Sequence, residues 1–166
     1  MKKLLVVLCG ALLASFVLTG LAQAADKFAY INLGRAFNEY SKTKDYDKSL
    51  TEKENNYTAE RDKKIKDLNS FRDKFTLLSD KEKEAKKGEL ENKAKAVKDF
   101  ITQRETDLRK EQEDRMKEIL KDIETVVKDY SEKEGYTMVF NDRVLVYQNK
   151  NMDITDKVIA LLNKKK

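Results

Sequence analysis

The sequence predicts an α+β protein that is predominantly α, in which a long antiparallel helical hairpin, the arm, rises from a small β-containing body. Three observations predict this class. Residues 41–134 carry 25 basic and 25 acidic side chains, over half of the segment, so they cannot enclose an ordinary hydrophobic core. The apolar residues of that segment recur at helical spacing, and the 166-residue chain has no proline to interrupt a helix. Short runs of β-branched and aromatic residues flank the segment on both sides.

The first 24 residues predict a cleaved secretory signal peptide. Lys2 and Lys3 precede a long apolar run, and an Ala-Gln-Ala sequence then supplies the small residues for cleavage after Ala24. An uncleaved membrane anchor is the alternative, because the run has the length that a membrane span needs. Export across a bacterial inner membrane would place the mature chain in the periplasm. Cys9 lies in the leader, so the mature chain has no cysteine and must rely on packing or assembly instead of disulfides.

Two thin apolar stripes within residues 41–134 predict the two helices of the arm. Their members recur mostly at steps of 3, 4, 7 and 11 residues, the spacing of a coiled-coil seam that one partner helix can cover. A single unbroken helix would be about 150 Å long, so a reversal is expected. Ser79 or Asp80 is the best candidate to cap a second helix, with Gly88 as the alternative, which sets the tip near residues 79–88. A disordered polyampholyte is the remaining alternative.

Residues 25–40 and 135–166 predict a β-rich body. Strand composition occurs at residues 28–32, and again at 136–140 and 144–147 on either side of a polar turn, which predicts a hairpin. Gly135 marks the end of the long helix, and Asp153 is placed to cap a last helix from Ile154 to about Leu162. Three short strands leave two open sheet edges, so we infer that copies of the chain assemble into an obligate homo-oligomer.

Alternation along the strands predicts two sets of side chains, of which one faces the oligomer axis, but it does not decide which. We expect the interface on the set Phe28, Tyr30, Val139, Val144 and Val146. The alternative set is Ala29, Ile31, Met138, Phe140, Leu145 and Tyr147.

Two stretches of the mature chain resemble the Skp/OmpH family of periplasmic chaperones. Residues 28–40 (FAYINLGRAFNEY) are similar to the family's opening strand and first helical turns, and residues 135–147 together with the Asp-Ile-Thr-Asp of 153–156 are similar to its closing hairpin and helix. The resemblance spans essentially the whole mature chain. It implies a jellyfish-shaped homotrimer, in which three helical hairpins enclose a cavity that holds unfolded outer-membrane proteins. The loop at 148–151 lacks the proline that relatives often carry, which leaves its path open.

Composition argues against most enzyme classes. The chain has no His for a Ser-His-Asp triad, and its five glycines are too scattered for a phosphate-binding loop, so we expect no catalytic residue, metal or cofactor. A holdase needs only weak, distributed contacts and no nucleotide. Together with what the family resemblance implies, this predicts an ATP-independent chaperone for unfolded outer-membrane proteins, with a structural spacer or tether of the envelope as the alternative. A net charge of +5 is weak support for nucleic-acid binding, and no specific nucleic acid is expected.

Two sets of arm residues are candidates for contacts with partners. We predict client binding by apolar side chains on the inner face of the arm, although helix-on-helix packing is the alternative use for them: Tyr57, Phe71, Phe75, Leu78 and Ile101. Residues 61–98 carry 13 bases and 8 acids, whereas residues 99–134 carry 8 bases and 12 acids, so a hairpin has a positive tip. A basic tip would meet anionic lipid or lipopolysaccharide, or simply keep the helix end in solution: Lys74, Lys81, Lys83, Lys86 and Lys87.

Overall fold

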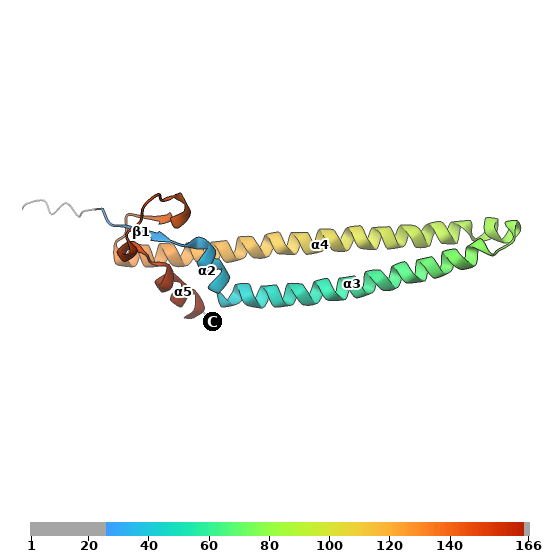
Figure 1. Cartoon of the computed structure of the whole chain (residues 1–166), viewed down its shortest axis with the longest axis horizontal. Coiled ribbons are helices and arrows are strands. Elements are labelled where there is room, and N and C mark those ends of the chain that lie inside the picture. Colours follow the sequence, from blue (N-terminus) through green and yellow to red (C-terminus); the bar gives the residue numbers. More distant parts are fainter. Residues whose placement is uncertain (1–25, 165–166) are drawn as a thin grey trace, which may run out of the picture.

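The computed structural model describes residues 26–164 and consists of a long two-helix arm on a small body (Figure 1). The helices and strands are, in chain order, β1 (Phe28–Ile31), α2 (Leu33–Glu39), α3 (Ser41–Thr76), α4 (Asp80–Glu134), β2 (Met138–Asn141) and α5 (Thr155–Lys164). Two short 3-10 helices, η1 (Asp142–Val144) and η2 (Lys150–Met152), lie between β2 and α5. The predominantly helical class with a small strand pair is therefore confirmed. The predicted signal peptide lies outside the described residues.

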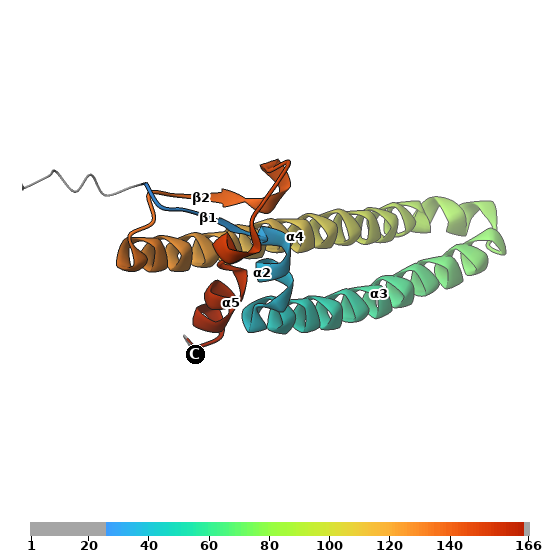
Figure 2. The same cartoon turned by 60° about the vertical axis from the view of Figure 1, so that its left-hand side comes forward.

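The arm consists of α3 and α4, which run antiparallel and meet at a tight turn (Figures 1 and 2). The predicted reversal at Ser79 is confirmed. Ser79 caps α4 in a capping box, in which its backbone N–H donates to the Glu82 carboxylate at 3.0 Å. Gly88, the alternative reversal point, lies inside α4.

The two arm helices differ in length, and the difference joins the arm to the body. At a rise of ~1.5 Å per residue, the 36 residues of α3 span about 54 Å and the 55 residues of α4 about 82 Å. The backbone at Tyr40 is extended, with φ −68° and ψ 126°, so the chain bends there and α2 leaves the line of α3. The last turns of α4 continue past the start of α3 into the body, where the strand pair appears above them and α5 below (Figure 2).

The hydrophobic core lies in the body, where β1, α2 and α5 pack on the last turns of α4 (Figure 2). The predicted closing helix is confirmed, and its predicted apolar residues Ile154, Val158, Ile159 and Leu162 are all buried. The core comprises Ala29, Ile31, Ala36, Tyr40, Ile119, Ile123, Val126, Ile154, Val158, Ile159 and Leu162. Because three of these residues belong to α4, that helix serves both the arm and the body.

The sheet corrects the predicted hairpin. β1 pairs with β2 in parallel, in the register Phe28↔Met138 to Ile31↔Asn141, and residues 144–147 form no strand. The chain turns away after β2 because the Asn141 side chain accepts a hydrogen bond from the Arg143 N–H and the Asp142 carbonyl accepts one from the Leu145 N–H. Residues 144–147 pair with no described strand, although their composition favours a strand.

The parallel register also corrects the predicted grouping of side chains. It places Phe28 and Tyr30 on the same face as Met138 and Phe140, whereas Val139 lies beside Ala29 on the other face. Ala29 is 1% exposed, and Val139 packs against the core. The set predicted for the oligomer interface therefore does not share one face, because alternation within each strand does not fix the register between the two strands.

Candidate functional site

Aromatic side chains line the seam of the arm, and cations cover their rings. Tyr57 of α3 and Phe100 of α4 are half-buried, with ring centroids 6.1 Å apart. The Arg61 guanidinium lies 5.7 Å from the Tyr57 ring, and the Lys64 ammonium lies 4.8 Å from the Phe100 ring. The Tyr57 hydroxyl donates to Glu105 at 3.2 Å. Such pairs keep apolar rings at the surface of the arm next to mobile, hydrated charges.

Phe71 has the same environment nearer the tip. The ammonium groups of Lys93 and Lys86 lie 5.2 Å and 5.8 Å from its ring centroid. All five residues predicted to bind clients are half-buried, so they share their surface between the neighbouring helix and solvent. Sequence reasoning missed two apolar residues of the arm. Phe100 adjoins Ile101 on the seam, and Leu77 in the tip turn is 87% exposed.

The root of the arm, where α3 and α4 meet the body, is joined by ion pairs. Lys42 Nζ lies 2.6 Å from Glu118 and 2.8 Å from Asp122. These hydrogen bonds, first to Asp122 and then to Glu118, raise the pKa of Lys42 well above its ordinary value. Contacts with Lys42 and with the Tyr46 hydroxyl in turn lower the pKa of Glu118. Both partners therefore stay charged near neutral pH.

Arg115 adds a second connection just above the root. Its guanidinium donates to the Tyr46 carbonyl at 3.0 Å, pairs with Glu111 and lies 4.6 Å from the Tyr46 ring centroid. Lys53 reaches Glu111 from α3 at 2.5 Å, and this contact is the largest cause of the lowered pKa of Glu111. The arm thus begins with a continuous polar network.

Polar contacts between the two arm helices stop about half-way to the tip. In the described chain, the last one is Glu60 to Arg104 at 3.9 Å. Beyond it, α3 and α4 meet only through apolar contacts, such as those of buried Leu68, and through the lysines over Phe71 and Phe100. The outer half of the arm therefore lacks the directional contacts of the root.

The structure places the five predicted tip lysines on both sides of the turn. Lys74 lies in the last turn of α3, and the other four lie in the first turns of α4. Among the five, only Lys86 forms an ion pair with a described residue, to Glu89 at 3.7 Å. Four of the five tip lysines therefore form no ion pair in the described arm, although five acidic side chains lie in the same turns: Asp73, Asp80, Glu82, Glu84 and Glu89.

The outer face of the sheet is apolar and largely uncovered. Together with the following loop, it forms a shallow depression of about 340 Å³, lined by Phe28, Ala29, Tyr30, Phe140, Leu145, Tyr147, Gln148, Asn149 and Met152. Val144 is 69% exposed, and Val146 and Tyr147 next to it are more exposed still. Of the residues predicted for the oligomer interface, Phe28 and Tyr30 line the depression, although Tyr30 is only 4% exposed, and Val144 and Val146 are exposed on the following loop. We call this surface the outer face of the body.

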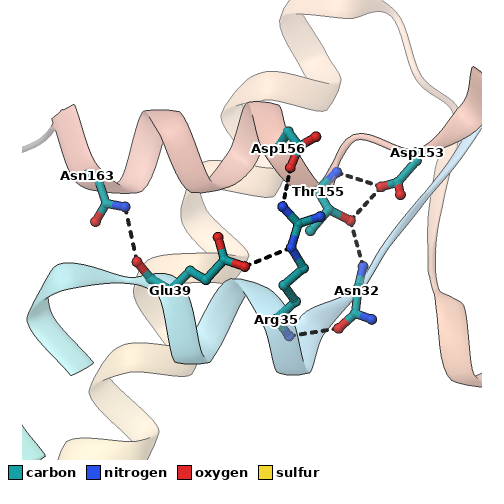
Figure 3. Close-up of polar contacts among 7 residues, drawn as sticks. All are labelled: Asn32, Arg35, Glu39, Asp153, Thr155, Asp156 and Asn163. Atoms are coloured by element: carbon teal, nitrogen blue, oxygen red, sulfur yellow. Dashed lines mark hydrogen bonds and ion pairs between the residues drawn. The ribbon is translucent and has the colours of Figure 1, made fainter. Parts of the chain in front are cut away.

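A polar cluster joins the two ends of the chain (Figure 3). The Thr155 hydroxyl accepts from the Asn32 N–H at 2.9 Å and donates to Asp153, which also accepts from the Thr155 N–H. Arg35 bridges Glu39 and Asp156, at 2.8 Å to the former. The Asp-Ile-Thr-Asp tetrapeptide thus fixes α5 to the turn after β1.

No helix within the described residues 26–164 is long and apolar enough to cross a membrane. No group of three or more Cys, Asp or Glu side chains in that part of the chain is arranged to hold a metal ion.

The fold is that of a small α+β body with a long helical-hairpin arm, which has apolar rings along its seam and lysines at its tip. The family described as "Outer membrane protein (OmpH-like)" matches residues 27–162, and the chain belongs to this family. Over 149 residues it is 30% identical to the chaperone protein Skp of Photorhabdus laumondii, covering 83% of this chain and 86% of the relative. The same figures hold for the chaperone protein Skp of Photorhabdus luminescens.

A solved structure has the same fold. It is a putative outer membrane chaperone, OmpH-like, from Caulobacter crescentus, with a TM-score of 0.76 at 18% identity, covering 86% of this chain and 87% of that one. The family and its chaperone members support a chaperone role for this chain and favour a function without catalysis.

Proposed function

We propose that this chain is an ATP-independent periplasmic holdase, which assembles as a homotrimer and holds unfolded outer-membrane β-barrel proteins between its arms. Holding them would prevent their aggregation during transit to the outer membrane. Membership of a chaperone family supports the class of function. The single observation that carries the proposal is the arm: a long helical hairpin whose aromatic seam is only partly covered by its own helices.

The outer face of the body supports assembly. β2 pairs with β1 alone in the described chain, so its second edge is open, and the adjoining Val144, Val146 and Tyr147 are exposed. Exposed apolar surface beside an open strand edge is unfavourable in a soluble protein unless another chain covers it. Copies of the chain would cover this face for one another and so bring their arms around a common axis.

The chemistry of the arm supports weak and adaptable binding. Tyr57, Phe71 and Phe100 offer ring surface at intervals along the seam, each beside a cation that can move aside. Individually weak contacts of this kind suit a client without fixed structure, because no single geometry is required. No nucleotide is needed for such binding.

Dilution of a urea-unfolded outer-membrane β-barrel protein into buffer, with and without the mature chain, tests the proposal. Light scattering should fall to near the buffer level at a molar excess of trimer, and sedimentation velocity should show one elongated species that carries the client. A mature chain that forms trimers but leaves the client to aggregate would favour the spacer or tether instead. A monomeric mature chain would contradict the assembly.

Changing Phe71 and Phe75 together to Ser tests the arm surface. The double variant should form trimers and keep its helix content but hold clients at least several-fold more weakly. The control changes Met116 and Leu120, two exposed apolar residues at the root, to Ser. This control variant should keep its client binding. Equal client binding by the Phe71/Phe75 variant and the parent would mean that these rings serve helix packing alone.

The basic tip is proposed to contact anionic lipid or lipopolysaccharide. Vesicles with anionic lipid should bind the mature chain, and the binding should weaken steeply with added salt because surface charges are screened. Changing the five tip lysines to Gln should abolish it. The control changes five exposed lysines of α4 away from the tip to Gln: Lys110, Lys117, Lys121, Lys128 and Lys133. Equal loss of vesicle binding in the control and the tip variant would contradict a tip site.

A further inference from the structure

The positive charge of the arm is concentrated in one band that lies below the tip. Residues 63–72 of α3 and 92–98 of α4 carry seven basic side chains and one acidic side chain, and we call them the basic band. The turn region itself, residues 73–84, carries three bases and four acids. The inner half of the arm, residues 41–60 and 105–134, carries 11 bases and 16 acids. The attraction of the arm for an anionic partner is therefore strongest at the basic band.

A groove between the two arm helices lies within the basic band. It has a volume of about 230 Å³ and adjoins Leu68, which is 7% exposed. Its lining combines apolar side chains with two ammonium groups and one carboxylate: Lys64, Asp67, Leu68, Lys93, Ala96 and Val97. The groove can therefore accept an apolar side chain and an anionic group at the same time.

The two lysines of this groove are held by weak contacts. The Lys64 ammonium lies 4.8 Å from the Phe100 ring centroid and forms no ion pair with a described residue. The Lys93 ammonium lies 5.2 Å from the Phe71 ring centroid. Lys93 also pairs with Glu89 at 3.6 Å, but both side chains are about half exposed, and such pairs contribute little. Both ammonium groups are therefore free to turn toward a carboxylate that a partner brings.

A second groove of the arm, nearer the body, is already neutralised by its own side chains. It is lined by three acids and two bases. Both bases are paired, because Lys53 Nζ lies 2.5 Å from Glu111 and the Arg104 guanidinium lies 3.9 Å from Glu60. A carboxylate that entered this groove would meet three others. The groove at Leu68 is therefore the better acceptor for an anionic group.

We propose that the groove at Leu68 binds segments of an unfolded client in which an acidic residue adjoins an apolar one. The carboxylate pairs with Lys64 and Lys93, and the neighbouring apolar side chain packs on the apolar surface of the groove. As the two ammonium groups turn to the carboxylate, they uncover the rings of Phe71 and Phe100 for further apolar contacts. The inference rests on the proposed holdase function and names the kind of client segment that this part of the arm selects.

Fluorescence anisotropy with three labelled, unfolded peptides of equal length tests this preference on the mature chain. The first peptide carries Leu-Glu pairs separated by Gly-Ser spacers, and the second carries Leu-Gln pairs instead. The third has the composition of the first but collects its Glu residues at one end and its Leu residues at the other. At low salt the first peptide should bind about tenfold more tightly than the second and several-fold more tightly than the third. Added salt should reduce the difference between the first two.

Two double variants locate the site. Changing Lys64 and Lys93 to Gln removes both ammonium groups from the groove and should abolish the preference for the first peptide. The matched control changes Lys63 and Lys95 to Gln; both residues are exposed in the basic band, but neither lines the groove. The control removes the same charge from the band and should keep most of the preference. Circular dichroism should show the same helix content in both variants and the parent.

The outcomes distinguish this inference from the proposed function. Equal loss of preference in the two variants, or equal binding of the first and third peptides, would mean that the band attracts negative charge as a whole and would overturn the groove site. A mature chain that keeps the urea-unfolded β-barrel client soluble but binds the first two peptides equally would overturn the preference and leave the holdase intact. A mature chain that neither holds the client nor binds any peptide would overturn both.

Discussion

The arm and the body share one helix but are stabilised in different ways. In the last turns of α4, within the body, Ile119, Ile123 and Val126 are at most 4% exposed. Over the rest of that helix, no residue is buried, and on the arm portion of α3 beyond its first turn only Leu68 is. Within a few turns, the same helix therefore changes from a segment packed in the core to a segment without buried residues.

This contrast shows how a chain with 39% charged residues can have both a fixed fold and an open surface. The body concentrates the scarce apolar burial, which is the main source of folding free energy. The arm depends on local helix formation, a thin seam and exposed ion pairs, each of which contributes little. An arm built in this way remains available to a client, because its own folding does not consume its apolar side chains.

The largest expected effect tests the body. Ile123→Ala removes a side chain that is 1% exposed at the centre of the core, and it should lower the free energy of unfolding by about 3 kcal/mol because it leaves a cavity. Urea unfolding followed by circular dichroism measures the loss. Hydrogen exchange should show the change most strongly in α5, which packs on this part of α4.

The matched change in the arm is Ile101→Ala, which removes the same atoms from a half-buried site. It should cost about 1 kcal/mol or less, because less apolar surface is lost from contact. Equal losses for the two variants would mean that the arm seam is packed as tightly as the core.

The polar cluster of Figure 3 is the next test. Thr155→Val keeps the shape of a fully buried side chain but removes the hydroxyl that links Asn32 to Asp153. The loss should be about 2 kcal/mol, because the Asn32 N–H is left without an acceptor in a part-buried position. Thr106→Val on the arm is the control, since that hydroxyl bonds only to a carbonyl of its own exposed helix. Stability should hardly change in the control.

Much of the helical fold could be predicted because its signals are local. Ser79 with Glu82 specifies a helix start, Gly135 specifies a helix end, and the spacing of Ile154, Val158 and Leu162 specifies the face of α5. The parallel pairing of β1 with β2 could not be predicted in this way. More than a hundred residues separate these strands, and only the packing of both on α4 brings them together in that register.

The sequence predicted the kinds of residue in the candidate site but not how their side chains are arranged. Apolar spacing pointed to Tyr57 and Phe71, yet it could not show that Lys93 lies over the Phe71 ring, because that contact joins α4 to α3. The missing strand at residues 144–147 has a similar cause. Its composition favours pairing, but the turn at Asn141 and Asp142 precedes it and residues 144–147 pair with no described strand, so Val146 remains exposed.

The last comparison sets Gly135, at the junction of arm and body, against Gly88 in the outer arm. Gly135, at the junction, has φ 72°, and Gly135→Ala should destabilise by about 1 to 2 kcal/mol because a side chain is strained in this conformation. Gly88 lies within α4, and an added Cβ would meet nothing within 4 Å. Gly88→Ala should therefore stabilise by about 0.5 to 1 kcal/mol, since alanine loses less conformational freedom in a helix. Thermal unfolding should show a lower melting temperature for Gly135→Ala and a higher one for Gly88→Ala. A destabilising Gly88→Ala would show that the outer arm needs the flexibility of this glycine. It would contradict the view that the arm at residue 88 depends only on local helix formation.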